Sequence, residues 1–295
     1  MKRRVEAALV LFGVLALAAG DVRVITIEYP EGTRSGNLRT GPWIYESEKP
    51  DGIQGQVEEL QILSSRAVLR APEGMSMQEA EGNRVAEFTG GVTVKRGRVS
   101  ATGPSLSYEE ATGVGVLQGP AQMVQAPSDA DDDPVEVQAS MMAFDVDSDV
   151  SRSQGQVKFK SGPQEGQAER IYFEEERELA ILTTPGGRVE LVRRRPEGDL
   201  RIQAGEVRSL TDSGRLVATG GVVLIDGDLT TKGEGLSYDD NTGEAFVVGN
   251  PAQSTSEEEG VEISAGTLRH DVNEHRVELY SQPYDLPLAE FTPRE

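Results

Sequence analysis

The side chains that could do chemistry are of few kinds and lie far apart. The chain has no cysteine, so it can form neither a disulfide nor a thiolate metal site. Its two histidines, His270 and His275, do not stand in a zinc-type motif. The 50 Asp and Glu residues are spread over the whole chain, and no pair stands out as a general acid and base. The sequence therefore predicts no catalytic residues, no metal site and no cofactor.

The amino-acid composition makes some classes of binding partner unfavourable. The formal net charge is −21, and such an acidic surface repels the phosphates of nucleic acids and anionic membranes. Hydrophobic residues make up 37% of the chain, yet they recur regularly along it. This pattern favours a thin, extended architecture with much surface per residue over a disordered chain.

One stretch of sequence occurs twice. Residues 88–113 read FTGGVTVKRGRVSATGPSLSYEEATG and residues 218–243 read ATGGVVLIDGDLTTKGEGLSYDDNTG, with 11 of 26 positions identical. Gly90 and Tyr108 in the first copy correspond to Gly220 and Tyr238 in the second. The glycines do not have phosphate-loop spacing, and no helix pattern follows them. The repeat is therefore interpreted as a structural unit, with the glycines at its turns and the tyrosines bracing its strands.

Alternation of apolar and polar residues predicts the fold class. Val92 and Val94, Val157 and Phe159, and Val222 and Leu224 each place apolar side chains on one face of a strand. Gly, Asp and Asn clusters separate these strands. Units of roughly 30 residues that cannot bury their apolar face alone stack on their neighbours. We predict an all-β, elongated, twisted antiparallel β-jelly roll of tandem strand-turn-strand units, with a β-helix or solenoid as the alternative.

The repeats and the leader suggest how the chain is divided. Residues 1–20 join a basic segment, MKRR, to an apolar run, which is the pattern of a signal peptide cleaved near Ala18. An uncleaved membrane anchor is the alternative. The expected segments after residues 1–20 are a first segment at 21–59, a repeat module at 60–156, intervening β units at 157–199, a second module at 200–282 and a tail at 283–295.

These residues resemble the OstA/LptA family of periplasmic lipopolysaccharide-transport proteins. The similarity lies in Gly91-Val-Thr-Val with Leu106-Ser-Tyr108, and again in Gly221-Val-Val-Leu with Leu236-Ser-Tyr238. It covers roughly residues 60–282. The resemblance implies a V-shaped β-jelly roll in the periplasm whose apolar interior holds the acyl chains of lipopolysaccharide or another glycolipid. It also implies end-to-end stacking on envelope transport proteins, and no catalytic motif is carried over.

The residues expected to line the interior are those of the alternating strands. The candidates for contact with lipid are Val92, Val94, Val157, Phe159, Val222 and Leu224. Exposed strand edges at the ends of such a fold would pair with partner proteins edge to edge, or with a second copy. No nucleic-acid partner is expected.

Two other functions remain open at this point. A ligand-free structural or scaffold β protein of the envelope would have the same strands with a filled core. A carbohydrate-active enzyme on a β-helix would need a cluster of acids, which the sequence does not single out. Neither the identity of the lipid nor the oligomeric state can be read from the sequence.

Overall fold

The computed structural model describes residues 23–129, 133–196 and 198–294, so the expected signal peptide lies outside the described residues. Apart from one 3₁₀ turn, η1 (Leu288–Phe291), every regular element is a β-strand. The strands are β1 (Thr26–Glu28), β2 (Thr33–Gly36), β3 (Trp43–Glu46), β4 (Ile53–Val57), β5 (Leu60–Ser64), β6 (Arg66–Arg70), β7 (Val85–Arg96), β8 (Val99–Glu109), β9 (Val114–Gln125), β10 (Val135–Asp145), β11 (Val150–Ser161), β12 (Gln164–Glu174), β13 (Leu179–Thr183), β14 (Val189–Arg193), β15 (Leu200–Ala204), β16 (Glu206–Leu210), β17 (Arg215–Asp226), β18 (Leu229–Asp239), β19 (Glu244–Ser256), β20 (Val261–Asp271) and β21 (Arg276–Leu279).

The long strands fold the sheet over on itself. In β7 the residues before Gly90 pair with β6, whereas those after Gly91 pair with β5. Both glycines have positive φ, and the register shifts between Thr89 and Val92. Such a bulge bends a strand sharply. The ten long strands thus contribute to two half-sheets that face each other, with the bends along one side.

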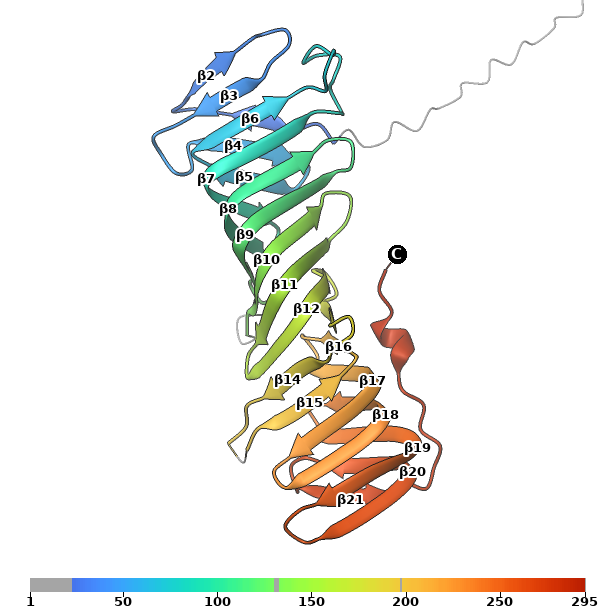
Figure 1. The fold of residues 1–295 in the computed structure, drawn as a ribbon. Coiled ribbons are helices and arrows are strands. Elements are labelled where there is room, and N and C mark those ends of the chain that lie inside the picture. The colour runs from blue at the N-terminus through green and yellow to red at the C-terminus, as the bar shows by residue number, and fades with distance from the viewer. Residues whose placement is uncertain (1–22, 130–132, 197, 295) are drawn as a thin grey trace, which may run out of the picture.

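The short strands extend each half-sheet separately. The first half-sheet runs β2, β3, β6, β7 and onward, and the second runs β1, β4, β5, β7 and onward. In mid-chain, β12 divides its partners in the same way: Arg170–Glu174 pairs with β13, and Gln164–Gln167 pairs with β14. Strands β16 and β15 then lead both half-sheets back onto β17. The strands form one elongated, twisted stack from β2 to β21 (Figure 1).

The two similar stretches of sequence form the same elements. β7 and β17 have equal lengths and bend at Gly90 and Gly220, where φ is +85° and +80°. Neighbouring residues approach the backbone closely at both bends, which explains why glycine stands there. A Cβ on Gly90 would lie 2.0 Å from the Ser65 Oγ, and one on Gly220 would lie 3.1 Å from the Gly205 Cα. A larger residue at position 90 would displace the Ser65 side chain, and one at position 220 would press on the backbone of Gly205.

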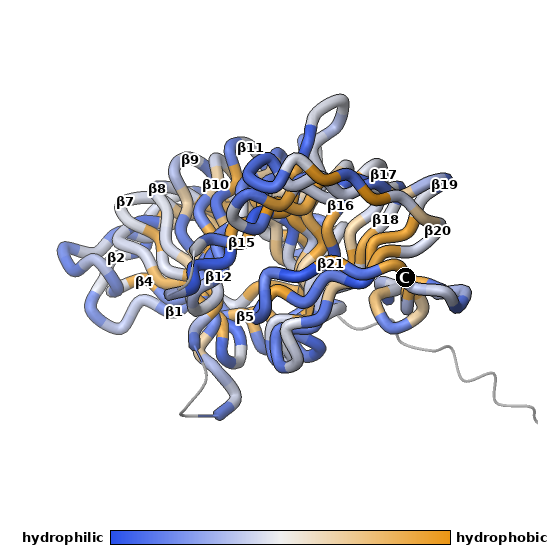
Figure 2. Tube along the Cα trace, turned by 90° about the horizontal axis from the view of Figure 1, so that it is seen from below, coloured by the Kyte–Doolittle hydropathy of each residue, from blue (hydrophilic) through white to orange (hydrophobic). Residues whose placement is uncertain are grey.

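The hydrophobic core lies between the half-sheets. One cluster of buried residues extends from Ile25 to Val272 without interruption. Figure 2 shows hydrophobic residues along the strands and hydrophilic ones in the turns around them. All strand pairings in the described residues are antiparallel, which confirms the predicted antiparallel all-β fold and excludes the parallel β-helix. No helix in the described part of the chain is long and apolar enough to cross a bilayer.

Candidate functional site

The candidate site is the space between the half-sheets, together with the rims opposite the bends. The six residues predicted to line it lie together on the inner face of the second half-sheet. All six are buried, at most 2% exposed: Val92, Val94, Val157, Phe159, Val222 and Leu224. They pack against inward side chains of the first half-sheet within the same cluster. The interior is therefore apolar and filled by its own side chains.

The two tyrosines of the similar stretches lie opposite these residues, on the first half-sheet. The Tyr108 hydroxyl donates to the carbonyl of Arg23 at 2.9 Å, and the Tyr238 hydroxyl donates to Asp240 Oδ1 at 2.9 Å. Burial raises the pKa of both phenols well above the usual value. Each ring thus occupies the interior while its hydroxyl is bonded near the rim.

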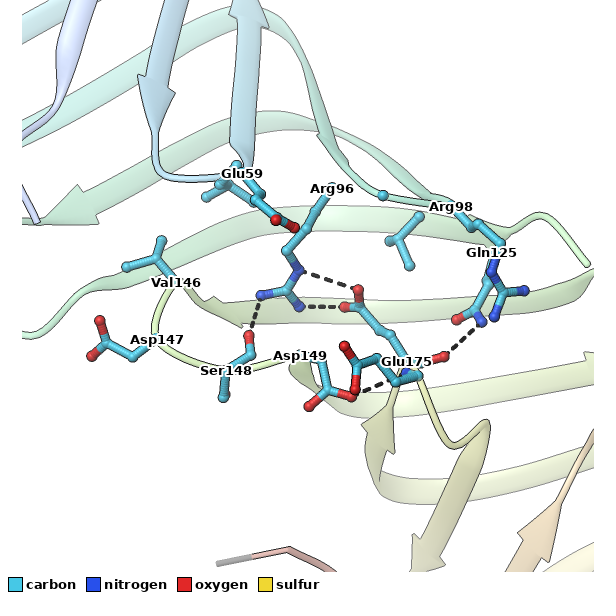
Figure 3. A pocket seen from close by; sticks show the side chains of 13 residues that line it. Glu59, Arg96, Arg98, Gln125, Val146, Asp147, Ser148, Asp149 and Glu175 are labelled. Atoms are coloured by element: carbon cyan, nitrogen blue, oxygen red, sulfur yellow. Dashed lines mark hydrogen bonds and ion pairs between the residues drawn. The ribbon is translucent and has the colours of Figure 1, made fainter. Parts of the chain in front are cut away.

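At the rims, opposite the bends, polar side chains join the two half-sheets. Arg96 ends β7 in the second half-sheet, and Glu175 follows β12 in the first. Arg96 Nε donates to Glu175 Oε2 at 3.1 Å, and its terminal nitrogens donate to the carbonyls of Ser148 at 2.7 Å and Val150 at 3.3 Å. Figure 3 shows the guanidinium reaching from one ribbon to the carboxylate of the other. The pair therefore bridges the two rims.

Three further side chains complete this bridge. Arg98 is 2.8 Å from Glu178 Oε1, and Gln125 Nε2 donates to the carbonyl of Glu175 at 3.0 Å. We call Arg96, Arg98, Gln125, Glu175 and Glu178 the first latch. Burial raises the pKa of Glu175, and the charge and hydrogen bonds of Arg96 offset only part of this effect. A pocket of about 560 Å³ lies beside the latch.

A second latch joins the rims farther along the chain, and we define it as Arg195, Asp226, His270 and His275. Asp226 ends β17 in the second half-sheet, while His270 belongs to the first half-sheet at the end of β20. Asp226 Oδ2 is 3.1 Å from His270 Nε2, and its Oδ1 is 3.1 Å from His275 Nδ1. Arg195 pairs with the same carboxylate and donates to the carbonyl of Val272 at 2.7 Å.

The electrostatics of Asp226 differ from those of Glu175. Burial acts to raise the pKa of Asp226, but the hydrogen bond with His270 and the charge of Arg195 outweigh it. The pKa of Asp226 therefore lies below its ordinary value. The carboxylate is held in its charged form, and this favours a tightly closed second latch.

The charged groups of the latches are arranged to hold the two rims together. In both latches the acids are engaged by arginine or histidine donors, which leaves them poorly placed as a free acid and base. No group of three or more metal-ligating side chains is assembled within the described ranges. The latches therefore join the two half-sheets along their polar rims, on either side of a packed apolar interior.

Sequence reasoning did not identify the latches. Arg96 and Asp226 stand at the same position of the two similar stretches, 130 residues apart, and carry opposite charges. Each also continues an inward alternation, after Val94 and after Leu224. A charge at an inward position is the signal that could have been noticed, because such a group must be paired when buried. Its partner could not have been read from the sequence.

Comparison with known proteins shows a partial likeness to solved structures. No protein-family model matches the chain, and no curated protein matches it. Among solved structures it is similar to LptH from Pseudomonas aeruginosa, described as the LptA homologous periplasmic component of the conserved lipopolysaccharide transport device. The identity is 19% and the TM-score 0.35, over 44% of this chain and 95% of LptH.

Proposed function

We propose that the protein is a periplasmic carrier of an amphipathic lipid, of the lipopolysaccharide-like glycolipid class, in the biogenesis of the outer envelope. The observation that carries this proposal is the continuous apolar cluster between two half-sheets that are joined at the bends and only latched at the opposite rims. Each methylene of an acyl chain placed there gains about 0.8 kcal/mol relative to water.

Entry of a lipid requires the half-sheets to separate. The interior side chains fill the space between them, so an acyl chain must replace contacts such as those of Phe159 and Leu224. Separation should cost least at the rim opposite the bends, because the described strands form no backbone pairing from one half-sheet to the other there. Polar headgroups would then remain outside, beside the pocket at the first latch.

Edge strands supply the proposed contacts with partners. β20 pairs along its first half, Val261–Ala265, only with β19, and β21 pairs only with β20 among the described strands. Val261 and Leu279 are exposed at this end. We propose that envelope transport proteins, or a second copy, pair with these edges and continue the apolar interior.

Photo-crosslinking from adjacent positions tests the carrier function. A photoreactive phenylalanine analogue replaces Phe159, which faces inward, or Lys158, the exposed neighbour on the opposite face. Irradiation in cells followed by mass spectrometry should give a lipid adduct from position 159 and none from position 158. A folded protein without an adduct at 159, and without co-purifying lipid, would exclude the carrier function.

A ligand-free scaffold is the second candidate, and the close packing of the interior favours it. In that case crosslinking from the free edge at Val261 would give protein adducts while position 159 gives none. Localisation is tested separately by N-terminal sequencing of the mature protein. A protein that begins at Met1 would contradict export with cleavage near Ala18.

A further inference from the structure

Beyond β21, residues 280–294 return across the outer face of the first half-sheet. Tyr284 stacks on Phe246 of β19, with ring centroids 4.2 Å apart, and its hydroxyl is 2.8 Å from Ser237 Oγ of β18. Farther on, Phe291 of η1 is buried against Val217 of β17 and Ile181 of β13. We call residues 284–294 the strap. Figure 1 shows it running back along the stack toward β16.

The groove under the strap is built to receive this segment. Leu179, Ile181 and Val217 form an apolar cluster with Phe291, separate from the main core. Outer faces of the other strands are mostly polar and wet, but β13 is buried on both faces along most of its length. An apolar cluster on an outer face would be costly if it were left in water. Its cover is therefore part of the fold.

Two arginines, one in the turn before β13 and one on β16, bind the backbone of the strap. Arg177 donates to the carbonyls of Glu290 and Thr292, both at 2.9 Å, and Arg208 donates to the carbonyl of Phe291 at 3.2 Å. Such bonds fix a chain direction and register. The apolar anchor of this part of the strap is Phe291.

The far end of the strap contacts the turn that carries the first latch. The backbone amide of Arg294 donates to Glu174 Oε1 at 2.6 Å, and its guanidinium is 3.2 Å from Glu176 Oε2. Between these two residues lies Glu175, the partner of Arg96. The amide of Glu176 also donates to Asp149 Oδ2 at 3.0 Å. The strap thus holds both neighbours of the acid that bridges the rims.

We propose that the outer face of the first half-sheet is a peptide-docking groove whose occupant is the strap of the same chain, and that its occupancy keeps the first latch closed. Release of the strap frees the turn at residues 174–178 and weakens the bridge between the rims. A partner that captures the strap would therefore open the rim from the opposite face of the sheet. The inference holds whichever molecule the interior carries.

Hydrogen exchange on the full chain tests the coupling. In F291A the anchor is lost, whereas L288A changes an exposed residue of the same 3₁₀ turn. Exchange of residues 174–178 should be about tenfold faster or more in F291A, equivalent to about 1.4 kcal/mol, and unchanged in L288A. Exchange of that turn at the wild-type rate in F291A would overturn the coupling.

Peptide binding tests the groove itself. A fluorescent peptide of residues 283–294 should bind F291A protein, whose own strap is released, and should restore slow exchange at residues 174–178. It should not bind wild-type or L288A protein, in which the groove is occupied. A failure of the peptide to bind folded F291A protein would overturn the docking groove, and equal binding to all three proteins would do the same.

Discussion

The first latch allows a quantitative prediction about the Arg96–Glu175 pair. Both side chains are nearly buried, at 7% and 10% exposure, and Arg96 also donates to the backbone carbonyls of Ser148 and Val150. Replacing Arg96 by methionine keeps the length of the side chain but leaves a buried carboxylate without its partner. The loss of one member of a buried ion pair typically costs about 3–5 kcal/mol. We expect R96M to be destabilised by that amount.

Substitution of the acid should cost less. In E175Q the guanidinium keeps its carbonyl acceptors, and the amide oxygen of glutamine still accepts one hydrogen bond. The loss should be about 1.5–3 kcal/mol, the range for a hydrogen bond to a charged group. The double variant R96M/E175L leaves no unpaired charge, so it should be more stable than R96M.

Urea unfolding at neutral pH measures all three variants, with the midpoints compared at an unchanged denaturant slope. The reasoning is refuted if R96M lies within about 0.5 kcal/mol of wild type, the range of an ordinary surface substitution. It is also refuted if the double variant is no more stable than R96M, because removing the unpaired buried carboxylate must recover stability.

The pH dependence of the same variants gives an independent check. The pKa of Glu175 is raised in the folded state, so folding binds protons between the unfolded and the folded pKa. The contribution of Glu175 to stability therefore rises as pH falls through that window and is smallest above it. E175Q lacks this group, so the difference in stability between wild type and E175Q should shrink as pH rises.

Three further predictions concern other parts of the molecule. In D226N the charge held by the second latch is lost, which should cost about 3–5 kcal/mol at neutral pH. Because the pKa of Asp226 is lowered, its stabilisation is present above the unfolded pKa and lost as pH falls through the folded pKa, so D226N should melt with a flatter acid profile than wild type. G220A should lower the free energy of unfolding more than G227A does. Gly227 faces open space, so G227A loses only the about 1–2 kcal/mol that a positive φ costs a residue with a Cβ, whereas a Cβ at Gly220 also meets a neighbouring backbone. Equal midpoints for the two glycine variants in thermal melts would contradict close packing at the bend. F159A should lose about 3–5 kcal/mol in urea unfolding and K158A less than about 0.5 kcal/mol, and a reversal of that order would place Phe159 outside the core.

The repeating local pattern of apolar and polar residues allows the fold class to be predicted from the sequence. Period-two alternation at Val92 and Val94 predicts an inward face without any knowledge of partners, and the structure buries both residues. The glycine at residue 90 could be interpreted as a turn, but its contact with Ser65, which lies between β5 and β6, is not contained in the local pattern. Local sequence thus predicts strands and faces, while the pairing of half-sheets is set by contacts between distant segments.

The latches and the strap also depend on contacts between distant segments, so the sequence does not predict them. Arg96 and Glu175 are 79 residues apart, and nothing near either residue specifies the other. Phe291 lies after Pro287 in a stretch without alternation, so the segment looked like a tail. Its apolar partners, among them Ile181 and Val217, occupy positions that alternation assigns to a wet outer face. Only the return of the chain over the sheet makes those positions buried.

The strand ladder fixes how far the molecule reaches. The first half-sheet continues from β2 to β21 through unbroken pairings, and neighbouring strands are about 4.8 Å apart, so the ladder is about 70 Å long. Each hairpin of two long strands adds about 10 Å to this length and leaves the cross-section unchanged. The number of hairpins therefore determines the length of the molecule. A variant with one hairpin deleted would keep the same cross-section and be about 10 Å shorter.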